Sequence, residues 1–327
     1  MRSLVTGANG FIGSHVVRQL LAQGRQVRAF ILPGTDESNL EGLDVERTYG
    51  DVLDARAVRE AMDGCETLYH LAAIYAVWMR NPQKMWDVNV TGTSVMLNAA
   101  RDARVKRVVY TSSIAAVGHR DDGTPADEET RFNTWGDSLD YVRTKYLSEE
   151  VARSFIPAGL DLVFCNPAFP FGTGDVGPTP TGQIIVDVAR GVVRGWLEGG
   201  FCAVDVENVA AAHVLAEQKG RTGERYILGE HNVHYRDFFR MVCERVGKRF
   251  LDTRIPHAVA LTLAGAVEAG FKLRGKRPPM TYGAMRYALL TLHFDTSKAH
   301  RELGMPTTPL EETLDKAVAY FRERGKF

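Results

Sequence analysis

Three glycines near the start of the chain constrain the fold more than any other feature. Gly7, Gly10 and Gly13 follow the apolar segment 4–6, and an amphipathic pattern from about Phe11 to Gln23 comes next. The glycines therefore stand between a predicted strand and a predicted helix. Glycine at such positions permits a tight turn and lets a pyrophosphate lie against the helix N-terminus. The pattern predicts a dinucleotide-binding unit rather than an ordinary glycine turn.

Predicted strands and helices alternate through the rest of the first half of the chain. Strands are expected at 26–32, 45–49, 66–71, 107–111 and 160–165, and helices at 54–62, 84–103 and 139–154. Strands separated by helices of this length are typical of parallel βαβ units. We therefore predict an α/β fold of the Rossmann type, with a doubly wound parallel sheet.

The character of the sequence changes after Pro167. The segment 172–182 is rich in Gly, Pro and Thr and is predicted to be a loop. Short strands at 204–206 and 225–228 follow, and the mostly helical C-terminal third ends in an amphipathic helix at about 310–324.

Two parts of the chain are expected from this change. Residues 1–167 are predicted to form the dinucleotide-binding domain, and a later segment at about 200–220 is predicted to return to it. Residues 168–327 are predicted to be mainly a smaller substrate-binding lobe over the C-terminal strand edges, where ligands bind in such sheets.

Composition argues against several classes of function. The chain has 40 basic and 40 acidic residues, a formal net charge of zero and no long basic run, which disfavours nucleic-acid binding. His231 and His234 are spaced like metal ligands, but no third ligand is evident, so no metal site is expected.

The predicted location is the cytoplasm. Four scattered cysteines without a Cys-x-x-Cys spacing fit a reducing compartment. The N-terminus reads directly as a strand, which leaves no room for a targeting segment. The longest apolar stretch, 258–267, is shorter than the about 20 residues that a transmembrane helix needs.

Tyr141 and Lys145 form a second motif. They lie four residues apart in a predicted helix and therefore share one of its faces. An ammonium near a phenol favours the phenolate, so we expect Lys145 to lower a tyrosine pKa that is ordinarily about 10. Ser113 follows the strand at 107–111 and is expected at the C-terminal edge of the sheet, with Ser112 as the alternative serine. These groups are suited to general acid–base chemistry beside a bound cofactor.

Almost the whole chain resembles the extended short-chain dehydrogenase/reductase family. The resemblance rests on the glycine spacing, on Tyr141 with Lys145 and on the upstream serine. Further matching segments are 50–52, 71–73, 89–93, 111–113 and 166–167. Within the family the chain is most similar to the dihydroflavonol-reductase-like group and to proteins called hopanoid-associated sugar epimerases, through 39–43, 166–170, 178–182 and 294–299.

The resemblance implies a catalytic set. Ser113, which family position favours over Ser112, would bond a substrate carbonyl oxygen. Tyr141 would give that oxygen a proton as hydride arrives from the nicotinamide. Lys145 would hold the ribose hydroxyls. The activity implied is the reduction of a ketone or aldehyde, or the reverse reaction.

The resemblance also implies the residues that contact the cofactor. In the family, the position of Asp51 contacts adenine and the turn 71–73 lies beside the nicotinamide ribose, while the helix start at 89–92 supports the centre of the sheet. The implied contacts are Gly7, Asn9, Gly10, Phe11, Ile12, Gly13, Asp51, Val52, Leu71, Ala72, Ala73, Thr111, Tyr141, Lys145 and Pro167.

The cofactor is expected to be NADP(H) or NAD(H). NAD enzymes usually carry an acidic residue at the end of the second strand, which accepts from the ribose 2′-hydroxyl. The strand here ends Ile31-Leu32-Pro33, with neither that carboxylate nor the arginine of many NADP-preferring relatives at Leu32. The missing carboxylate removes a repulsion against a 2′-phosphate, so we favour NADP and leave NAD open.

An apolar and aromatic wall is predicted for the substrate. Its residues are Tyr75, Trp78, Phe169 and Phe171, beside Ser113, with Met280 and Tyr282 as further candidates. Such a pocket suits a carbonyl on an apolar or aromatic body. The family likeness also implies a homodimer through the helices beside the site.

Two alternatives remain open. An NAD-dependent sugar or nucleotide-sugar epimerase would use the same residues without net redox change. Dehydratases of the family tend to carry an acid after the serine, but this chain has Ile114-Ala115-Ala116. The second alternative, a regulator that senses NADP without catalysis, is disfavoured because both Tyr141 and Lys145 are present.

Overall fold

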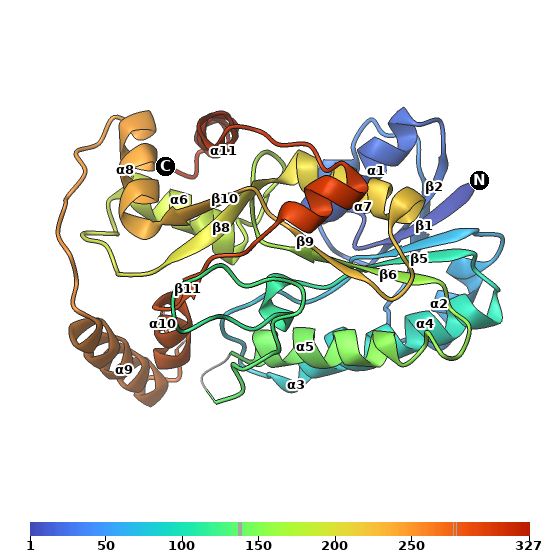
Figure 1. The fold of residues 1–327 in the computed structure, drawn as a ribbon, viewed down its shortest axis with the longest axis horizontal. Coiled ribbons are helices and arrows are strands. Elements are labelled where there is room, and N and C mark those ends of the chain that lie inside the picture. Colours follow the sequence, from blue (N-terminus) through green and yellow to red (C-terminus); the bar gives the residue numbers. More distant parts are fainter. Residues whose placement is uncertain (137–138, 277, 279) are drawn as a thin grey trace.

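A seven-stranded parallel sheet forms the centre of the computed structural model, which describes residues 1–136, 139–276, 278 and 280–327 (Figure 1). The strand order is β3-β2-β1-β4-β5-β6-β9, and every neighbouring pair is parallel. The strands are β1 (Arg2–Thr6), β2 (Gln26–Ile31), β3 (Glu46–Tyr49), β4 (Thr67–His70), β5 (Arg107–Thr111), β6 (Leu162–Pro167) and β9 (Arg225–Leu228). The predicted α/β doubly wound fold is confirmed.

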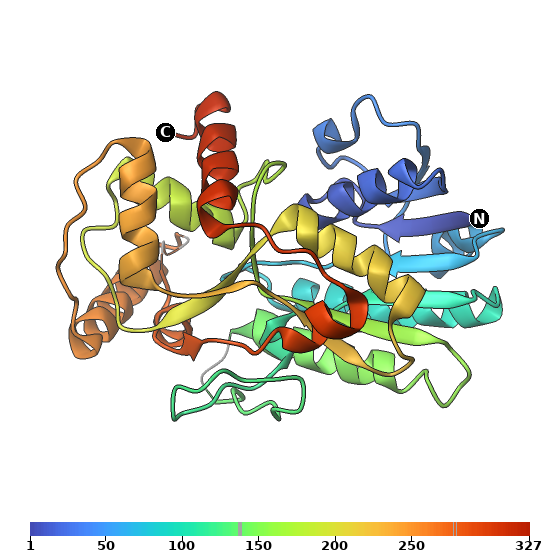
Figure 2. The same cartoon turned by 45° about the horizontal axis from the view of Figure 1, so that its top comes forward.

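Helices cover both faces of this sheet. On one face α1 (Phe11–Ala22) packs beside α7 (Val206–Lys219), as Figure 2 shows. The other face carries α2 (Ala55–Met62), α4 (Gly92–Asp102) and α5 (Asp140–Arg153). Because both faces are covered, the central strands are apolar along their length rather than alternating.

The helix predicted at 84–103 is interrupted. It consists of α3 (Gln83–Trp86), a wide π turn at Asp87–Thr91, and α4. The Thr93 hydroxyl, in the first turn of α4, donates to the carbonyl oxygen of Asn89 in this π turn at 2.7 Å. Such turns often occur at functional sites, and this one holds Asn89, whose contacts are described below.

A smaller sheet lies at the other end of the molecule. It contains β7 (Phe169–Phe171), β8 (Gly200–Asp205), β10 (His231–His234) and β11 (Thr291–Leu292), with β8 paired to the other three. The helices α6 (Pro180–Arg190), α8 (Tyr235–Val246) and α11 (Leu310–Glu323) pack on it around an aromatic core. Beyond them lie α9 (His257–Leu273) and α10 (Tyr282–Ala288), at the lower left of Figure 1.

Two boundaries differ from the sequence prediction. The loop expected at 172–182 ends earlier, because the Thr179 hydroxyl accepts from the Gly182 N–H at 3.2 Å and caps α6, with Pro180 in its first turn. The strand expected at 204–206 starts at Gly200 and stops at Asp205, whose carboxylate caps α7.

The later part of the chain contributes to the larger sheet. β9 pairs with β6 as the seventh strand, and α7 lies against α1 on the same face. In the part of the chain that the structure describes, no helix is long and apolar enough to cross a membrane.

Candidate active site

The glycine turn joins β1 to α1 in a conformation that side chains would prevent. Gly7 has φ +63°, and a Cβ there would lie 3.1 Å from the backbone of Ala72. A Cβ on Gly13 would lie 2.0 Å from the Gly7 carbonyl oxygen. The Gly10 N–H donates to that oxygen at 3.0 Å. The turn is therefore tight because three backbone segments meet where only hydrogen atoms fit.

The start of α1 is suited to an anion. Gly10 caps the helix with no side-chain hydrogen bond, and the first turn contains no acidic residue. The first N–H groups of a helix carry partial positive charge and need acceptors. A pyrophosphate fits this cradle, so the residues present are compatible with a dinucleotide, with Phe11 and Ile12 at the helix start as predicted.

Thr6 ties the glycine turn to the next strand end. Its hydroxyl oxygen accepts from the N–H groups of Leu71 and Ala72, at 3.1 and 3.0 Å. The same oxygen lies 2.8 Å from Nδ1 of the buried His70. The turn 71–73 therefore lies against Gly7, which brings two of the predicted cofactor segments together.

Tyr141 and Lys145 lie on one face of α5, as their spacing predicts. The ring of Tyr141 is packed against Tyr75, with centroids 4.6 Å apart. The Lys145 ammonium donates to the Thr111 carbonyl oxygen at 2.7 Å. Ser113 is buried at the end of β5, where its hydroxyl accepts from the Ala115 N–H at 3.1 Å. The sequence-predicted catalytic residues therefore converge at the C-terminal edge of the sheet.

The pKa of Tyr141 moves opposite to the sequence expectation. Burial raises it above its ordinary value, the phenol of Tyr75 adds to the rise, and hydrogen bonding with Ser113 opposes it. The expectation that Lys145 lowers this pKa is wrong for this arrangement, because the ammonium is directed to the Thr111 carbonyl instead. Tyr141 therefore holds its proton at neutral pH and is a proton donor.

Burial lowers the pKa of Lys145, whereas it raises that of Tyr141. Desolvation lowers the pKa of Lys145 to about 8, while the charge of Glu149 raises it. The lysine therefore changes charge near neutral pH, which makes its surroundings important for the site.

A buried polar network lies under Ser113. The Asn166 amide donates both to the Ser113 carbonyl oxygen and to Glu149 Oε2, each at 2.9 Å. Glu149 is only 1% exposed and forms ion pairs with Arg153 at 2.8 Å and Arg225 at 3.5 Å. The network connects β6, where Asn166 lies, with the helix that carries Lys145.

Asn89 supports the same helix from the other side. Its carboxamide oxygen accepts from the Ile74 N–H at 2.7 Å, and its amide nitrogen donates to the Thr144 hydroxyl at 3.0 Å. The Thr144 hydroxyl in turn donates to the Tyr141 carbonyl oxygen at 2.8 Å. The support expected from the helix start at 89–92 therefore reaches the catalytic helix directly.

Several predicted cofactor residues are used in holding the site together. The Asn9 amide donates to the Thr35 hydroxyl at 2.9 Å and to the Asp36 carbonyl oxygen at 2.8 Å. The Thr111 hydroxyl lies 2.9 Å from Nε2 of His213. The side chains of Asn9 and Thr111 therefore hold neighbouring segments in place, while their backbone atoms lie at the predicted cofactor site. Asp51 and Val52 follow β3, and Pro167 ends β6.

The residue after β2 is uncharged, because Leu32 stands where NAD enzymes usually carry a carboxylate. Leu32 is 45% exposed there. The Asp36 carboxylate accepts from the Ser38 N–H at 2.8 Å within its own turn. Arg28 is buried, and its guanidinium binds Glu46 and the carbonyl oxygens at the end of α2.

The predicted substrate wall is only partly assembled. Tyr75 is 38% exposed and its hydroxyl lies 3.2 Å from the Thr181 hydroxyl on α6. Trp78 lies in the same loop as Tyr75, and Phe169 is half-buried against Phe201. Phe171 is 1% exposed in the aromatic core, so its prediction as a substrate residue is replaced by a packing role.

Sequence reasoning missed other residues of this region. Tyr287 on α10 lies close enough to Tyr75 and Tyr141 for their phenols to add to the rise that burial causes in its pKa. Glu149, four residues after Lys145 on the same helix face, was missed as well. Its regular spacing could have indicated it, whereas nothing in the local sequence indicates Tyr287.

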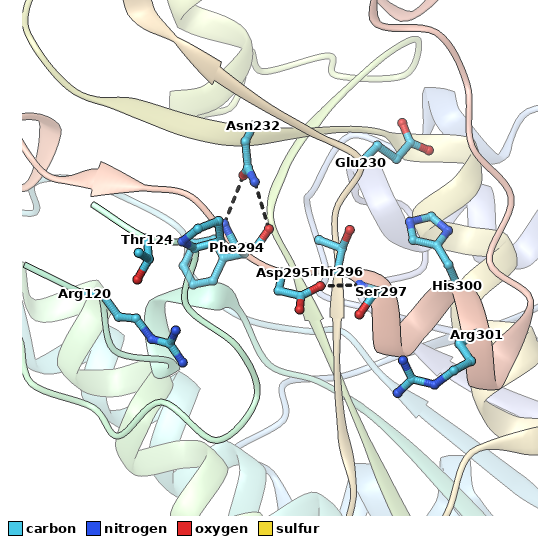
Figure 3. Close-up of a pocket in the computed structure, with 11 residues that line it drawn as sticks. Arg120, Thr124, Glu230, Asn232, Phe294, Asp295, Thr296, Ser297, His300 and Arg301 are labelled. Atoms are coloured by element: carbon cyan, nitrogen blue, oxygen red, sulfur yellow. Dashed lines mark hydrogen bonds between the residues drawn. The ribbon is translucent and has the colours of Figure 1, made fainter. Parts of the chain in front are cut away.

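A separate depression lies between the loop 118–127, β10 and residues 294–301 (Figure 3). The Asn232 carboxamide crosses it, accepting from the Phe294 N–H at 3.0 Å and donating to its carbonyl oxygen at 2.9 Å. Arg120, at its edge, pairs with Asp127. None of the predicted catalytic or cofactor residues lines it. Within the described residues no His, Cys, Asp and Glu cluster could hold a metal ion.

Comparisons with known proteins bear on the family and the fold of the chain. The family model described as "NAD dependent epimerase/dehydratase family" matches residues 3–229. The chain is 38% identical to sterol demethylase protein B of Methylococcus capsulatus, over 99% of both chains. It is 32% identical to cinnamoyl-CoA reductase 1 of Petunia hybrida, over 98% of this chain and 92% of that protein. The crystal structure of gox2253 superposes with a TM-score of 0.89 at 36% identity and covers 99% of both chains.

Proposed function

The chain belongs to the NAD-dependent epimerase/dehydratase family, an extended short-chain dehydrogenase/reductase family of nicotinamide-dependent oxidoreductases, and we propose that it reduces a ketone or aldehyde on an apolar body. The observation that carries the proposal is the placement of the Tyr141 phenol, which packs on Tyr75, hydrogen-bonds with Ser113 and lies one helical turn from Lys145. A group that keeps its proton at neutral pH is suited to donating it to a developing alkoxide.

Each residue has a distinct role in this proposal. Ser113 binds and orients the carbonyl oxygen of the substrate, and Tyr141 donates a proton to that oxygen. Lys145, as a cation, would hold the ribose hydroxyls of the cofactor. Tyr75 packs on Tyr141 and keeps water from one side of the phenol. A nicotinamide cofactor held by the glycine turn supplies the hydride.

Several features support reduction over dehydration. The segment 114–116 after the serine is apolar and buried, and it forms a short 3₁₀ turn. It therefore offers no second acid or base of the kind that elimination of water requires. Among the relatives, cinnamoyl-CoA reductase 1 is named as a reductase rather than a dehydratase. We further propose NADP(H) as the preferred cofactor, since Leu32 stands where NAD enzymes usually carry an acidic residue, and a homodimer through the helices beside the site, α5 among them.

The test is a panel of ketones and aldehydes assayed separately with NADH and NADPH. We expect Tyr141→Phe to lower kcat by about 10²–10⁴-fold, the range for loss of general acid catalysis, with cofactor affinity unchanged. Tyr146→Phe is the matched control, because Tyr146 lies on the same helix but stacks on Phe132 with centroids 4.3 Å apart. Full activity of Tyr141→Phe would refute the mechanism.

An NAD-dependent epimerase is the second candidate, favoured by the family that the sequence matches. Such an enzyme would purify with NAD bound and would oxidise no added NADH or NADPH with any carbonyl. The same panel, followed by denaturation and analysis of the released nucleotide, separates the two functions.

A further inference from the structure

The helix α9 has an apolar outer face. Its exposed side chains include Val259, Leu263 and Leu273, which are 47%, 59% and 90% exposed. These residues recur at intervals of four and ten, so they lie along one stripe of the helix. A helix on the surface of a globular protein normally turns its polar side outward, and α9 does the opposite.

The apolar exposure is concentrated in this part of the molecule. Of the thirteen exposed large apolar side chains in the described residues, five lie between 259 and 282, the other two being Met280 and Tyr282. In Figure 1, α9 and α10 lie together at one end of the molecule, away from the large sheet. An exposed apolar patch of this kind indicates a surface that binds a protein or a membrane.

Exposed cations outnumber carboxylates at the C-terminal end of α9. Lys272, Arg274 and Lys276 are exposed at the C-terminal end of α9. The single acidic residue between 257 and 276 is Glu268, whose carboxylate pairs with Lys272 at 2.6 Å and accepts from the Tyr282 N–H at 2.7 Å. Among the described residues, no carboxylate lies within ion-pair distance of Arg274 or Lys276.

We propose that this face of α9, with Met280 and Tyr282, docks on a phospholipid surface that contains anionic lipid. An apolar stripe next to exposed cations is the pattern of a helix that lies in the plane of a membrane interface. Basic side chains at such a surface are attracted to anionic headgroups. A second copy of the chain carries the same excess of positive charge here, so charge complementarity favours anionic lipid over self-association.

The dimensions are consistent with a helix that lies flat. Seventeen residues make a helix about 25 Å long, which is shorter than the hydrocarbon core of a bilayer at about 30 Å. Ala260 and Ala264, on the opposite side, are buried, and the helix packs on α10. Docking would leave these contacts in place and bring the α10 side of the active site, with Tyr287, towards the lipid.

Vesicle flotation with the full chain tests the proposal. We expect the protein to float with vesicles of phosphatidylcholine and phosphatidylglycerol, and to float less with phosphatidylcholine alone. Leu263→Glu should weaken vesicle binding roughly tenfold or more, because one buried leucine contributes about that factor. Val192→Glu is the matched control, since Val192 is 65% exposed but lies outside the patch. Arg274→Glu with Lys276→Glu should remove the preference for phosphatidylglycerol.

Three results would overturn the proposal. The wild-type protein could remain at the bottom of the gradient with both kinds of vesicle. Leu263→Glu could float as well as the wild type. Light scattering could show a wild-type dimer that Leu263→Glu dissociates while neither protein floats, in which case a second copy covers the face. Flotation requires no turnover, so its outcome is distinct from that of the carbonyl panel.

Discussion

Substitution of Glu149 tests whether its charge helps to set the pKa of Lys145. It is buried one helical turn after Lys145, and its charge opposes the lowering of the Lys145 pKa by burial. Glu149→Gln keeps the size of the side chain and an oxygen that can accept from the Asn166 amide. The substitution therefore removes the charge while preserving the contact that supports Ser113.

The size of the effect follows from the geometry. Side chains four apart on a helix lie about 6 Å apart, and two unit charges at that distance attract by roughly 3 kcal/mol at an effective dielectric constant of about 20. Water that reaches Arg153, which is 31% exposed, reduces this figure. We therefore take the attraction between Glu149 and Lys145 as about 1 to 2 kcal/mol. Its loss in Glu149→Gln lowers the pKa of Lys145 from about 8 to about 7 or below.

The direction of the pH effect depends on which form of Lys145 is active. The cationic lysine is the active form, so activity is present below its pKa and is lost as the pH rises through it. At pH 8 about half of Lys145 is charged in the wild type and about a tenth in Glu149→Gln, so kcat/KM should fall about fivefold. At pH 6 nearly all of it is charged in both proteins, and their activities should be similar.

The assay is the pH profile of kcat/KM with the best carbonyl of the panel. The matched control is Glu150→Gln, because Glu150 is the next residue, is 50% exposed and lies 3.8 Å from Arg153. Its alkaline limb should coincide with that of the wild type. An activity loss in Glu149→Gln that is equal at every pH would refute the electrostatic argument and leave Glu149 with a purely structural role.

Two further substitutions test the scaffold of the site. Gly13→Ala should abolish dinucleotide binding in a fluorescence titration, because the added methyl group would lie 2.0 Å from the Gly7 carbonyl oxygen; Gly270→Ala, where a methyl group meets open space, should bind normally. Asp205→Ala should lower the free energy of unfolding in urea by about 2–4 kcal/mol, since the carboxylate caps α7 and is buried against Thr313 and Lys316. Glu207→Ala, which removes an exposed partner of Lys316, should cost about 1 kcal/mol or less.

The sequence was sufficient for the features that depend on local pattern. The glycine turn, the alternation of strands and helices, and the shared face of Tyr141 and Lys145 follow from spacing alone. The convergence of Ser113 with them follows from the rule that parallel strands end at one edge of the sheet. These predictions needed no knowledge of distant contacts.

Features that depend on distant contacts could not be predicted in this way. The pKa of Tyr141 is set mainly by burial and by Tyr75, which a count of nearby charges does not include. The break at 87–91 accompanies the bonds of Asn89 to Ile74 and Thr144, two segments remote in sequence. Phe171 follows an active-site strand but faces the aromatic core, because β7 pairs with β8 of the smaller sheet.

The late position of β9 has a consequence for biosynthesis. A ribosome that has made residues 1–167 has produced six strands of the large sheet, but β6 still has an open edge and α1 lacks its neighbour α7. An open strand edge can pair with other chains. The nascent chain therefore needs to be extended beyond Leu228 before this half of the molecule can close, and we expect it to be prone to association with other chains until then.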